Sequence, residues 1–217
     1  MKRTKIQKML MLVLTVTMVA GSTLTVGAAG TGNKGTTTST AASDAAVVAA
    51  TVAIPSTDDV VVNGVKIETT IKGAYLAKEI NGFAVTTAAQ DIVSSCSLKA
   101  GQTPYILVMD TDTKKSSNAM ASLTAAATAL GAEMGPVINI DLGYRANNLF
   151  YTLPTDGAKV AMTVGIPADF VKADANYAVV VVRYGGAIEV LEDLDTDPAT
   201  VSFETSAGLG CYAVVRY

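Results

Sequence analysis

The sequence predicts an α+β protein in two parts: a small α/β half over residues 58–152 and an antiparallel β-sandwich half over residues 153–217. The first half contains a β-branched apolar run at 105–109, an alanine-rich segment at 116–133 and a second apolar run at 136–140. That order is typical of a βαβ unit, in which a helix connects two neighbouring parallel strands. The second half consists of short alternating segments separated by turn residues, which favours an antiparallel sandwich.

Residues 1–29 have the composition of an export signal peptide. Four basic residues precede an apolar segment at 9–20, and small residues at 27–29 suit a signal peptidase. A retained membrane anchor is the alternative, but the apolar segment is short for crossing a bilayer. We therefore expect a secreted protein, or one held non-covalently at the cell surface, with no transmembrane anchor after signal cleavage.

Signal cleavage makes the chain more acidic. The signal carries four basic residues and no acidic one, so the formal net charge falls from −3 to −7. A surface of that sign repels phosphate backbones, and nucleic acid is not expected as a partner. The predicted partner is an extracellular one that the composition does not identify.

The segment at 30–57 is rich in Thr, Ser and Ala. It predicts a disordered linker, because it cannot bury enough apolar surface to offset the entropy lost on ordering. A more apolar stretch at 45–54 could instead dock as an edge strand. Folded structure is expected to begin near Asp59.

Two Asn-Gly pairs predict hairpins, because Asn and Gly accept the positive φ angles of a type I′ turn. The pair at 63–64 connects apolar runs at 60–62 and 65–71, and the pair at 81–82 predicts a second hairpin around it. A short helix is expected at 88–95.

The alanine-rich segment has the end signals of a helix. Ser116 or Ser117 can cap its amino end, and Gly131 is placed to terminate it. One face carries a stripe of residues that we expect to pack on the sheet: Met120, Leu123, Ala127 and Leu130.

Five strands are predicted in the second half, at 160–166, 177–184, 187–191, 201–205 and 212–217. Gly185-Gly186 connects the second and third strands in a tight hairpin. An acidic segment at 192–198 is predicted to be a solvated turn. A calcium loop is the alternative, although the glycine and closing glutamate of an EF-hand are missing.

Six short motifs follow one another in this half: Ile166-Pro167, Tyr177-Ala178-Val179, Arg183-Tyr184-Gly185-Gly186, Val190-Leu191, Val201-Ser202-Phe203-Glu204-Thr205 and Tyr212-Ala213-Val214. Their spacing resembles a β-sandwich module that recurs near the C-termini of secreted and surface proteins of Gram-positive, often gut-dwelling, bacteria. The resemblance covers about residues 158–217 and implies an extracellular structural or adhesive part without catalytic residues. In that family a Ser or Thr usually precedes the Tyr of the final strand, whereas this chain has Cys211.

The composition excludes several kinds of active site. The chain has no histidine, so it contains no Ser-His-Asp triad, Cys-His pair or His-ligated zinc. Two cysteines cannot build a four-cysteine metal site. With no tryptophan and eight dispersed tyrosines, no aromatic platform for sugar rings is evident.

Cys96 and Cys211 are the two cysteines, and an exported chain with an even number allows one disulfide. Such a bridge would close a loop of roughly a hundred residues or more and stabilise the protein by about 4–5 kcal/mol on an entropic model. The alternative is a pair of buried free thiols that behave as small apolar side chains.

Three aspartates are the candidate metal ligands. Asp110 and Asp112 follow the first apolar run of the βαβ unit, and Asp141 follows the second. If the strands are parallel, their carboxyl ends meet at one edge of the sheet, where three carboxylates could hold Mg²⁺ or Ca²⁺. The alternative is that these residues form turns and the entry to a helix.

The order Asp110-Thr111-Asp112-Thr113 also resembles the first motif of haloacid-dehalogenase-type phosphatases. The resemblance implies Asp110 as the nucleophile and Asp112 as the acid/base. The other motifs of that family have no convincing counterparts in this chain.

These observations predict a secreted, non-enzymatic structural or adhesive extracellular protein, with no cofactor besides the metal considered above. One alternative is a metal-dependent, phosphatase-like hydrolase that uses Asp110, Asp112 and Asp141. The other is a glycan- or peptide-binding module, which needs an exposed apolar or aromatic patch.

Overall fold

The computed structural model describes residues 58–155, 157 and 159–217. The predicted export signal and the predicted linker lie outside the described residues. Among the residues described, no helix combines the length and the hydrophobicity that crossing a membrane requires.

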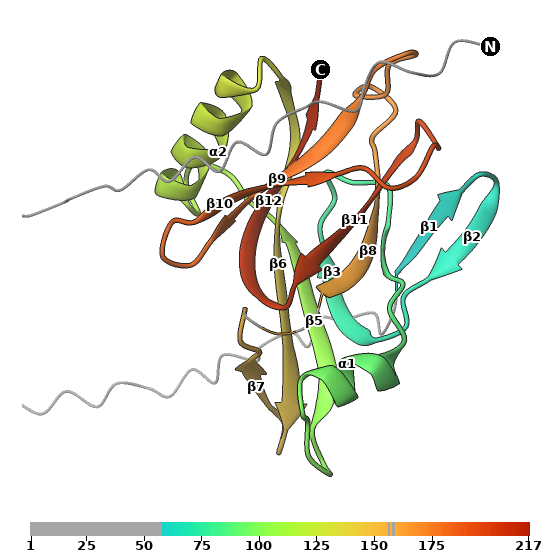
Figure 1. Ribbon diagram of the computed structural model, residues 1–217, viewed down its shortest axis with the longest axis vertical. Helices are drawn as coiled ribbons and strands as arrows, with labels where there is room; N and C mark the ends of the chain where they lie inside the picture. The colour runs from blue at the N-terminus through green and yellow to red at the C-terminus, as the bar shows by residue number, and fades with distance from the viewer. Residues whose placement is uncertain (1–57, 156, 158) are drawn as a thin grey trace, which may run out of the picture. The chain divides into compact units, whose positions relative to one another are not determined.

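Strands make up about half of the described chain, and two helices lie between them (Figure 1). The strands are β1 (Asp59–Val62), β2 (Val65–Glu68), β3 (Lys72–Leu76), β4 (Phe83–Val85), β5 (Thr103–Asp110), β6 (Glu133–Ala146), β7 (Leu149–Thr152), β8 (Lys159–Gly165), β9 (Tyr177–Arg183), β10 (Ile188–Glu192), β11 (Thr200–Ser206) and β12 (Gly208–Arg216). The helices are α1 (Ala89–Ser95) and α2 (Ser117–Ala129).

The largest sheet has the strand order β10-β9-β12-β6-β5-β3, and β7 pairs with β6 outside that path. β3 and β5 run parallel, whereas the other described pairs of this sheet are antiparallel. β6 is the longest of its strands: its first part pairs with β12 and its last part with β7, while β5 lies along it (Figure 1).

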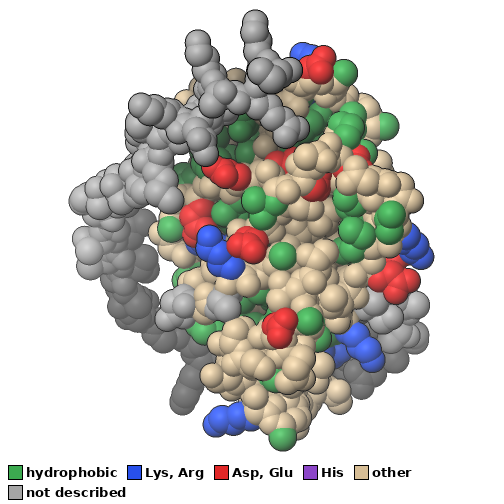
Figure 2. Space-filling view, turned by 45° about the vertical axis from the view of Figure 1, so that its right-hand side comes forward, with side chains coloured by type: hydrophobic (Ala, Val, Ile, Leu, Met, Phe, Trp, Pro, Cys, Tyr) green, Lys and Arg blue, Asp and Glu red, His purple; other side chains and the backbone are tan. Residues whose placement is uncertain are grey.

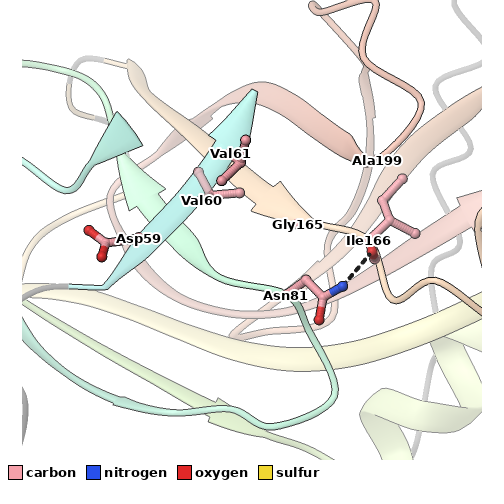
Figure 3. A pocket seen from close by; sticks show the side chains of 7 residues that line it. All are labelled: Asp59, Val60, Val61, Asn81, Gly165, Ile166 and Ala199. Carbon is pink, nitrogen blue, oxygen red and sulfur yellow. Dashed lines mark hydrogen bonds between the residues drawn. The ribbon is translucent and has the colours of Figure 1, made fainter. Parts of the chain in front are cut away.

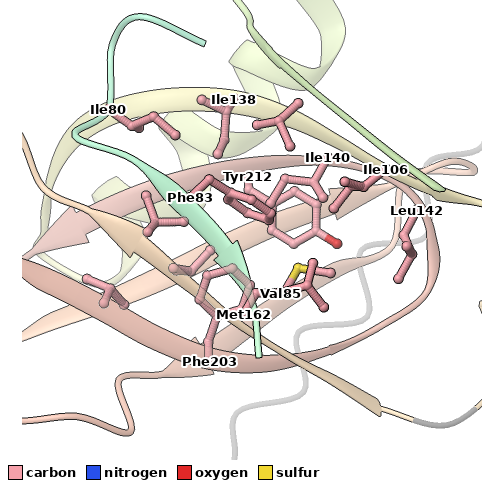
Figure 4. Packing of buried hydrophobic residues seen from close by; sticks show 14 of the residues in the cluster. Ile80, Phe83, Val85, Ile106, Ile138, Ile140, Leu142, Met162, Phe203 and Tyr212 are labelled. Atoms are coloured by element: carbon pink, nitrogen blue, oxygen red, sulfur yellow. The ribbon is translucent and has the colours of Figure 1, made fainter. Parts of the chain in front are cut away.

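A second sheet, in the order β11-β8-β4, shares one hydrophobic core with the large sheet (Figure 4). Phe83, Met162 and Phe203 project into this inner core from the small sheet, and each is at most 1% exposed. The large sheet supplies β-branched and aromatic side chains from five strands, among them Ile106, Ile138, Ile140, Val181 and Tyr212.

Backbone hydrogen bonds join the two sheets near both edges. Thr70 N–H donates to the carbonyl of Val85 at 2.9 Å, and Leu194 N–H donates to the carbonyl of Ser202 at 2.7 Å. Thr70 lies two residues before β3, and Leu194 lies two residues after β10; these are the two outer strands of the large sheet. The core is therefore bounded on two sides by hydrogen-bonded backbone.

α2 packs on the opposite, outer face of the large sheet, against β9, β12 and the beginning of β6 (Figure 1). As predicted, its stripe faces the sheet at Leu123 and Ala127, which are buried, and it ends before Gly131, which has φ +65°. Leu130 is 37% exposed, so the stripe does not extend through the last turn. Ser116 is the N-cap but its side chain makes no capping hydrogen bond.

The predicted βαβ unit is wrong in one respect: β5 and β6 are neighbours, but they run antiparallel. Val108 lies opposite Ile140, and Asp110 lies opposite Ile138. α2 does not cover β5 as a crossover helix would; it packs against β9, β12 and β6. The chain leaves the sheet at the end of β5, forms the helix there and re-enters the sheet at the same end.

Two of the predicted hairpins are confirmed. β1 pairs with β2 across Asn63 (φ 49°) and Gly64 (φ 77°), and β9 pairs with β10 across Gly185-Gly186. The predicted hairpin at 81–82 is wrong, because β3 pairs with β5 and β4 pairs with β8. Gly82 has the positive φ of a turn, but that local geometry does not select the partner of the strand that follows.

The boundary predicted between residues 152 and 153 does not separate two units. β12, from the second half, lies between β9 and β6, and β8, also from the second half, pairs with β4. Residues 158–217 supply the antiparallel strands predicted there, three to the large sheet and two to the small one. Both sheets are completed by strands from the first half.

Candidate ligand-binding site

The structure does not bring the three predicted metal ligands together. Successive residues of a strand project to opposite faces of a sheet. On β5, Asp110 continues the alternation of Ile106 and Val108, so it projects to the inner-core face. On β6, Asp141 lies between the inner-core residues Ile140 and Leu142, so it projects to the outer face. The carboxylates of Asp110 and Asp141 therefore lie on opposite faces of the sheet.

The carboxylates of Asp110 and Asp112 instead accept hydrogen bonds from backbone N–H groups. The Asp110 carboxylate accepts the N–H groups of Lys78 (2.8 Å) and Glu79 (3.0 Å), and Asp112 accepts those of Lys114 (2.8 Å) and Lys115 (2.9 Å). The hydrogen bond from the Lys115 N–H holds the pKa of Asp112 below its usual value. Asp112 thus forms the turn that leads to α2, which is the alternative stated above, whereas Asp110 anchors the distant segment that follows β3. In the described part of the chain, no three Asp, Glu, Cys or His side chains are grouped so that they could hold a metal ion.

The predicted disulfide is not formed. Cys96 and Cys211 are free thiols. Cys96 packs against the inner core, whereas Cys211 belongs to the outer cluster beneath α2, so the large sheet separates them. Burial, with a smaller contribution from Asp141, raises the pKa of the Cys211 thiol to about 11.

The acidic segment between β10 and β11 is a loop built on its own carboxylates. Asp193 accepts the N–H of Ser202 at 3.0 Å, and Asp195 accepts the N–H of Asp197 at 2.8 Å. Asp197 in turn accepts the N–H of Asn63, in the β1–β2 turn. These carboxylates have backbone donors as partners, as expected of a turn and not of an empty calcium loop.

A hollow of about 260 Å³ lies beside β1 (Figure 3). Its lining is mainly backbone and aliphatic side chains. The Asn81 amide at its rim donates to the carbonyl of Ile166 at 3.2 Å, and Asp59 pairs with Lys66 at 2.8 Å. Because both polar side chains already have partners, this hollow offers little to orient a ligand.

A second hollow, of about 320 Å³, is lined by polar and basic groups. We call it the basic hollow; the side chains that characterise it are Lys72, Thr103, Tyr105, Arg145, Asn147 and Asn148. It lies where β3 and β5 begin and β6 ends, next to the β6–β7 turn, at the lower end of the sheet in Figure 1. Thr103 pairs with Arg145, and Tyr105 pairs with Lys72.

Arg145 is held in place by two contacts. Its guanidinium carbon lies 4.8 Å from the centre of the Tyr105 ring, and Nη2 donates to the carbonyl of Asn148 at 3.3 Å. Phe150 packs its edge against Tyr105, with ring centres 6.4 Å apart. Such stacking leaves the remaining guanidinium N–H groups available while limiting the freedom of the side chain.

Lys72 and Arg145 lack the carboxylate partners that Arg183 and Arg216 have. The Nε atom of Arg183 lies 3.6 Å from Oε1 of Glu189, and Nη2 of Arg216 lies 2.5 Å from Oε2 of Glu133. Among the described residues, no carboxylate lies within 4.0 Å of the charged groups of Lys72 or Arg145. Acidic side chains are spread over other parts of the surface, as the face in Figure 2 shows. The basic hollow is thus a local positive site on an acidic protein.

The sequence reasoning missed this site. Lys72, Tyr105 and Arg145 are far apart in the chain, and they meet only because β5 and β6 pair antiparallel, which places the start of one beside the end of the other. The parallel arrangement that was predicted would have placed the start of β5 beside the start of β6. One usable signal was the turn pair Asn147-Asn148, whose positive φ angles (50° and 63°) form the β6–β7 turn.

Comparisons with protein-family models, with curated proteins and with solved structures gave no match to this chain. The β-rich fold and the basic hollow are therefore the basis for the function considered next.

Proposed function

We propose that this chain is an exported, non-enzymatic adhesive protein that binds an anionic extracellular ligand in the basic hollow. The observation that carries the proposal is the pair Lys72 and Arg145, two cations in one hollow without a carboxylate partner on an acidic chain. Both side chains are exposed to solvent, so they can attract an anion from solution without a carboxylate of the protein competing for them.

The frame around the hollow supports binding. Its residues lie at the ends of strands that are anchored in the core. Ile106 on β5 and Leu142 on β6, close to the hollow along the chain, are at most 1% exposed. The turn at 147–148 and the loop before β5 are short, and Lys99 and Gln102 bond to each other in that loop (3.0 Å and 2.8 Å). Binding residues on short loops held by a packed sheet lose little conformational entropy when a ligand arrives.

The export signal predicted at 1–29 and the resemblance over residues 158–217 support an extracellular, adhesive setting for this binding. The lining groups are cations, hydroxyls, amides and a phenol. Such a set suits recognition of an anion through hydrogen bonds and charge.

Retention on immobilised polysaccharides tests the proposal. Labelled protein comprising residues 30–217 is passed over polygalacturonate, heparin and neutral dextran, at low salt and at high salt. We expect retention on an acidic polymer, weakened by salt because the attraction is between exposed charges. Arg145→Ala and Lys72→Ala should each reduce retention severalfold.

The matched control is Lys66→Ala, which removes the same charge from an exposed lysine on β2 that already pairs with Asp59. It should leave retention unchanged. If no polymer retains the protein, or if Arg145→Ala is retained as well as the unchanged protein, the proposed function is contradicted.

A further inference from the structure

We propose that the basic hollow recognises a uronic-acid sugar, with the sugar carboxylate bound between Arg145 and Lys72. This inference rests on the proposed function and names the chemistry of its ligand. It is drawn from the register of three strands, from the lining of the hollow and from the charge of the surrounding surface.

The register places a cation on each side of one aromatic ring. Tyr105 is paired with Lys72 on β3, and the guanidinium of Arg145 on β6 lies 4.8 Å from the centre of the Tyr105 ring. The β6 residue opposite Tyr105 is Gly143, and Arg145 lies two residues further along β6, opposite Thr103. Lys72 and Arg145 are therefore two strands apart, roughly 10 Å, and are also offset by two residues along the strands. A group that contacts both cations lies diagonally across Tyr105.

Arginine and lysine would act differently on that group. The planar guanidinium presents paired N–H groups that match the two oxygens of a carboxylate. One Arg145 N–H is already used by the Asn148 carbonyl, which fixes the plane of the guanidinium. Lys72 adds a compact charge with no fixed geometry.

The remaining lining suits a sugar ring. Thr103, Asn147 and Asn148 supply a hydroxyl and two amides, which both donate and accept hydrogen bonds as sugar hydroxyls require. Tyr105 and Pro104 supply apolar surface beside them. A volume of about 320 Å³ lies at the small end of the range for ligand pockets, as one or two sugar units need.

Charge density favours a carboxylated sugar over a heavily sulfated one. The hollow offers two cations, and the mature chain carries a net charge of −7 after loss of the predicted signal. A polymer with several charges on each unit would be repelled by the net negative charge of the mature chain. An acidic peptide is less favoured, because peptides commonly add along the open edge of a sheet, whereas the hollow lies at strand ends.

Calorimetric titration of the chain at residues 30–217 tests the proposal. The probe is trigalacturonate, and the matched probe is its methyl ester, which keeps the sugar rings and removes the charges. We expect saturable binding of trigalacturonate and at least tenfold weaker binding of the ester, since a charge-assisted hydrogen bond is typically worth a factor of ten or more. A sulfated heparin hexasaccharide and a glutamate heptapeptide complete the probes.

Variants assign the binding to the hollow. Arg145→Ala should weaken the binding of trigalacturonate at least tenfold. Arg145→Lys should recover only part of it, because the charge returns without the planar pair of donors. Lys66→Ala should bind as the unchanged protein does, and thermal unfolding shows that each variant is folded.

The outcomes of these titrations distinguish the carboxylate assignment, the uronic-acid assignment and the proposed function. Equal binding of the acid and the ester overturns the carboxylate assignment, and so does full recovery in Arg145→Lys. Tighter binding of the heparin hexasaccharide or of the peptide overturns the uronic-acid assignment while leaving an anion-binding adhesive function in place. Failure of every probe, together with no retention on any polymer, contradicts both this inference and the proposed function.

Discussion

Asp193 is a carboxylate whose surroundings oppose its ionised form. It lies in the loop after β10 and accepts N–H groups from Ser202 (3.0 Å) and Asp195 (3.2 Å). Those hydrogen bonds favour the carboxylate, but burial outweighs them and raises the pKa of Asp193 to about 6. The folded protein therefore keeps a proton on Asp193 in a pH range where the unfolded chain has released it.

That difference predicts how stability depends on pH. Below its ordinary pKa of 3.8 the group is protonated in both states, and between 3.8 and about 6 only the folded state holds the proton. The contribution to the free energy of unfolding is therefore present at low pH and is lost as the pH rises through 6. Asp193→Asn should raise the free energy of unfolding at pH 7 by about 1 kcal/mol, a value reduced for solvent screening.

Urea unfolding of Asp193→Asn at a series of pH values measures this effect. The gain should shrink towards pH 4, and the Asn oxygen still accepts both N–H groups. Asp169→Asn, at an exposed position between β8 and β9, is the control and should change stability by less than about 0.5 kcal/mol at pH 7. A gain that grows on acidification would contradict the prediction.

Residue chemistry was also what the sequence predicted best. The turn at Asn63-Gly64 and the helix stop at Gly131 follow from φ angles that these residues accept locally, and both are present. The turn role offered as the alternative for Asp112 is also local, since its carboxylate bonds to the N–H groups two and three residues later. Such features depend on a few neighbouring residues, which a sequence displays directly.

At the scale of the elements, strand partners could not be predicted with the same success. The apolar runs of β5 and β6 have the same pattern whether the strands are parallel or antiparallel, because both of their faces are partly or fully buried. The helix between them suggested a crossover. Because the strands pair antiparallel, the end of β5 lies beside the beginning of β6, and Asp110 does not meet Asp141. The beginning of β5 lies beside the end of β6, which brings Tyr105 near Arg145.

The contact of β1 with the turn before β4 is a second feature that only the structure reveals. A Cβ atom on Gly82 would lie 1.8 Å from the carbonyl oxygen of Asp59, so only glycine permits β1 to approach this closely. The backbone cannot move away easily, because Gly165 N–H donates to the Gly82 carbonyl at 3.0 Å. Gly82 also has φ +96°, which a side chain tolerates poorly.

Gly82→Ala should therefore destabilise the protein by about 3–5 kcal/mol, combining backbone strain with displacement of β1. Gly185→Ala is the matched control: Gly185 has nearly the same φ, +93°, and a Cβ atom there meets nothing within 4 Å. It should cost only about 1–2 kcal/mol. Urea midpoints of the two variants measure the difference, and equal losses would show that the contact with Asp59 adds nothing.

At the scale of the whole molecule, the described residues belong to one compact unit. Composition shifts and turn signals suggested two halves because local patterns change near residue 152. Long-range pairing decides otherwise: β12 lies in the centre of the large sheet, bonded to β9 on one side and to β6 on the other. β4 similarly completes the small sheet beside β8.

The two halves should consequently fail to fold alone. A fragment of residues 153–217 would expose the edge of β12 that β6 covers, together with core positions such as Tyr212 and Val214 that are now at most 3% exposed. Exposed strand edges and apolar surface of this kind favour aggregation over a unique fold. Residues 54–217 should unfold in one cooperative transition, whereas residues 54–152 and 153–217 should each show none, as followed by near-ultraviolet circular dichroism and amide NMR dispersion. A well-dispersed spectrum from residues 153–217 would mean that the inner core does not need the strands of the first half, and that the shared sheet is not what holds the molecule together.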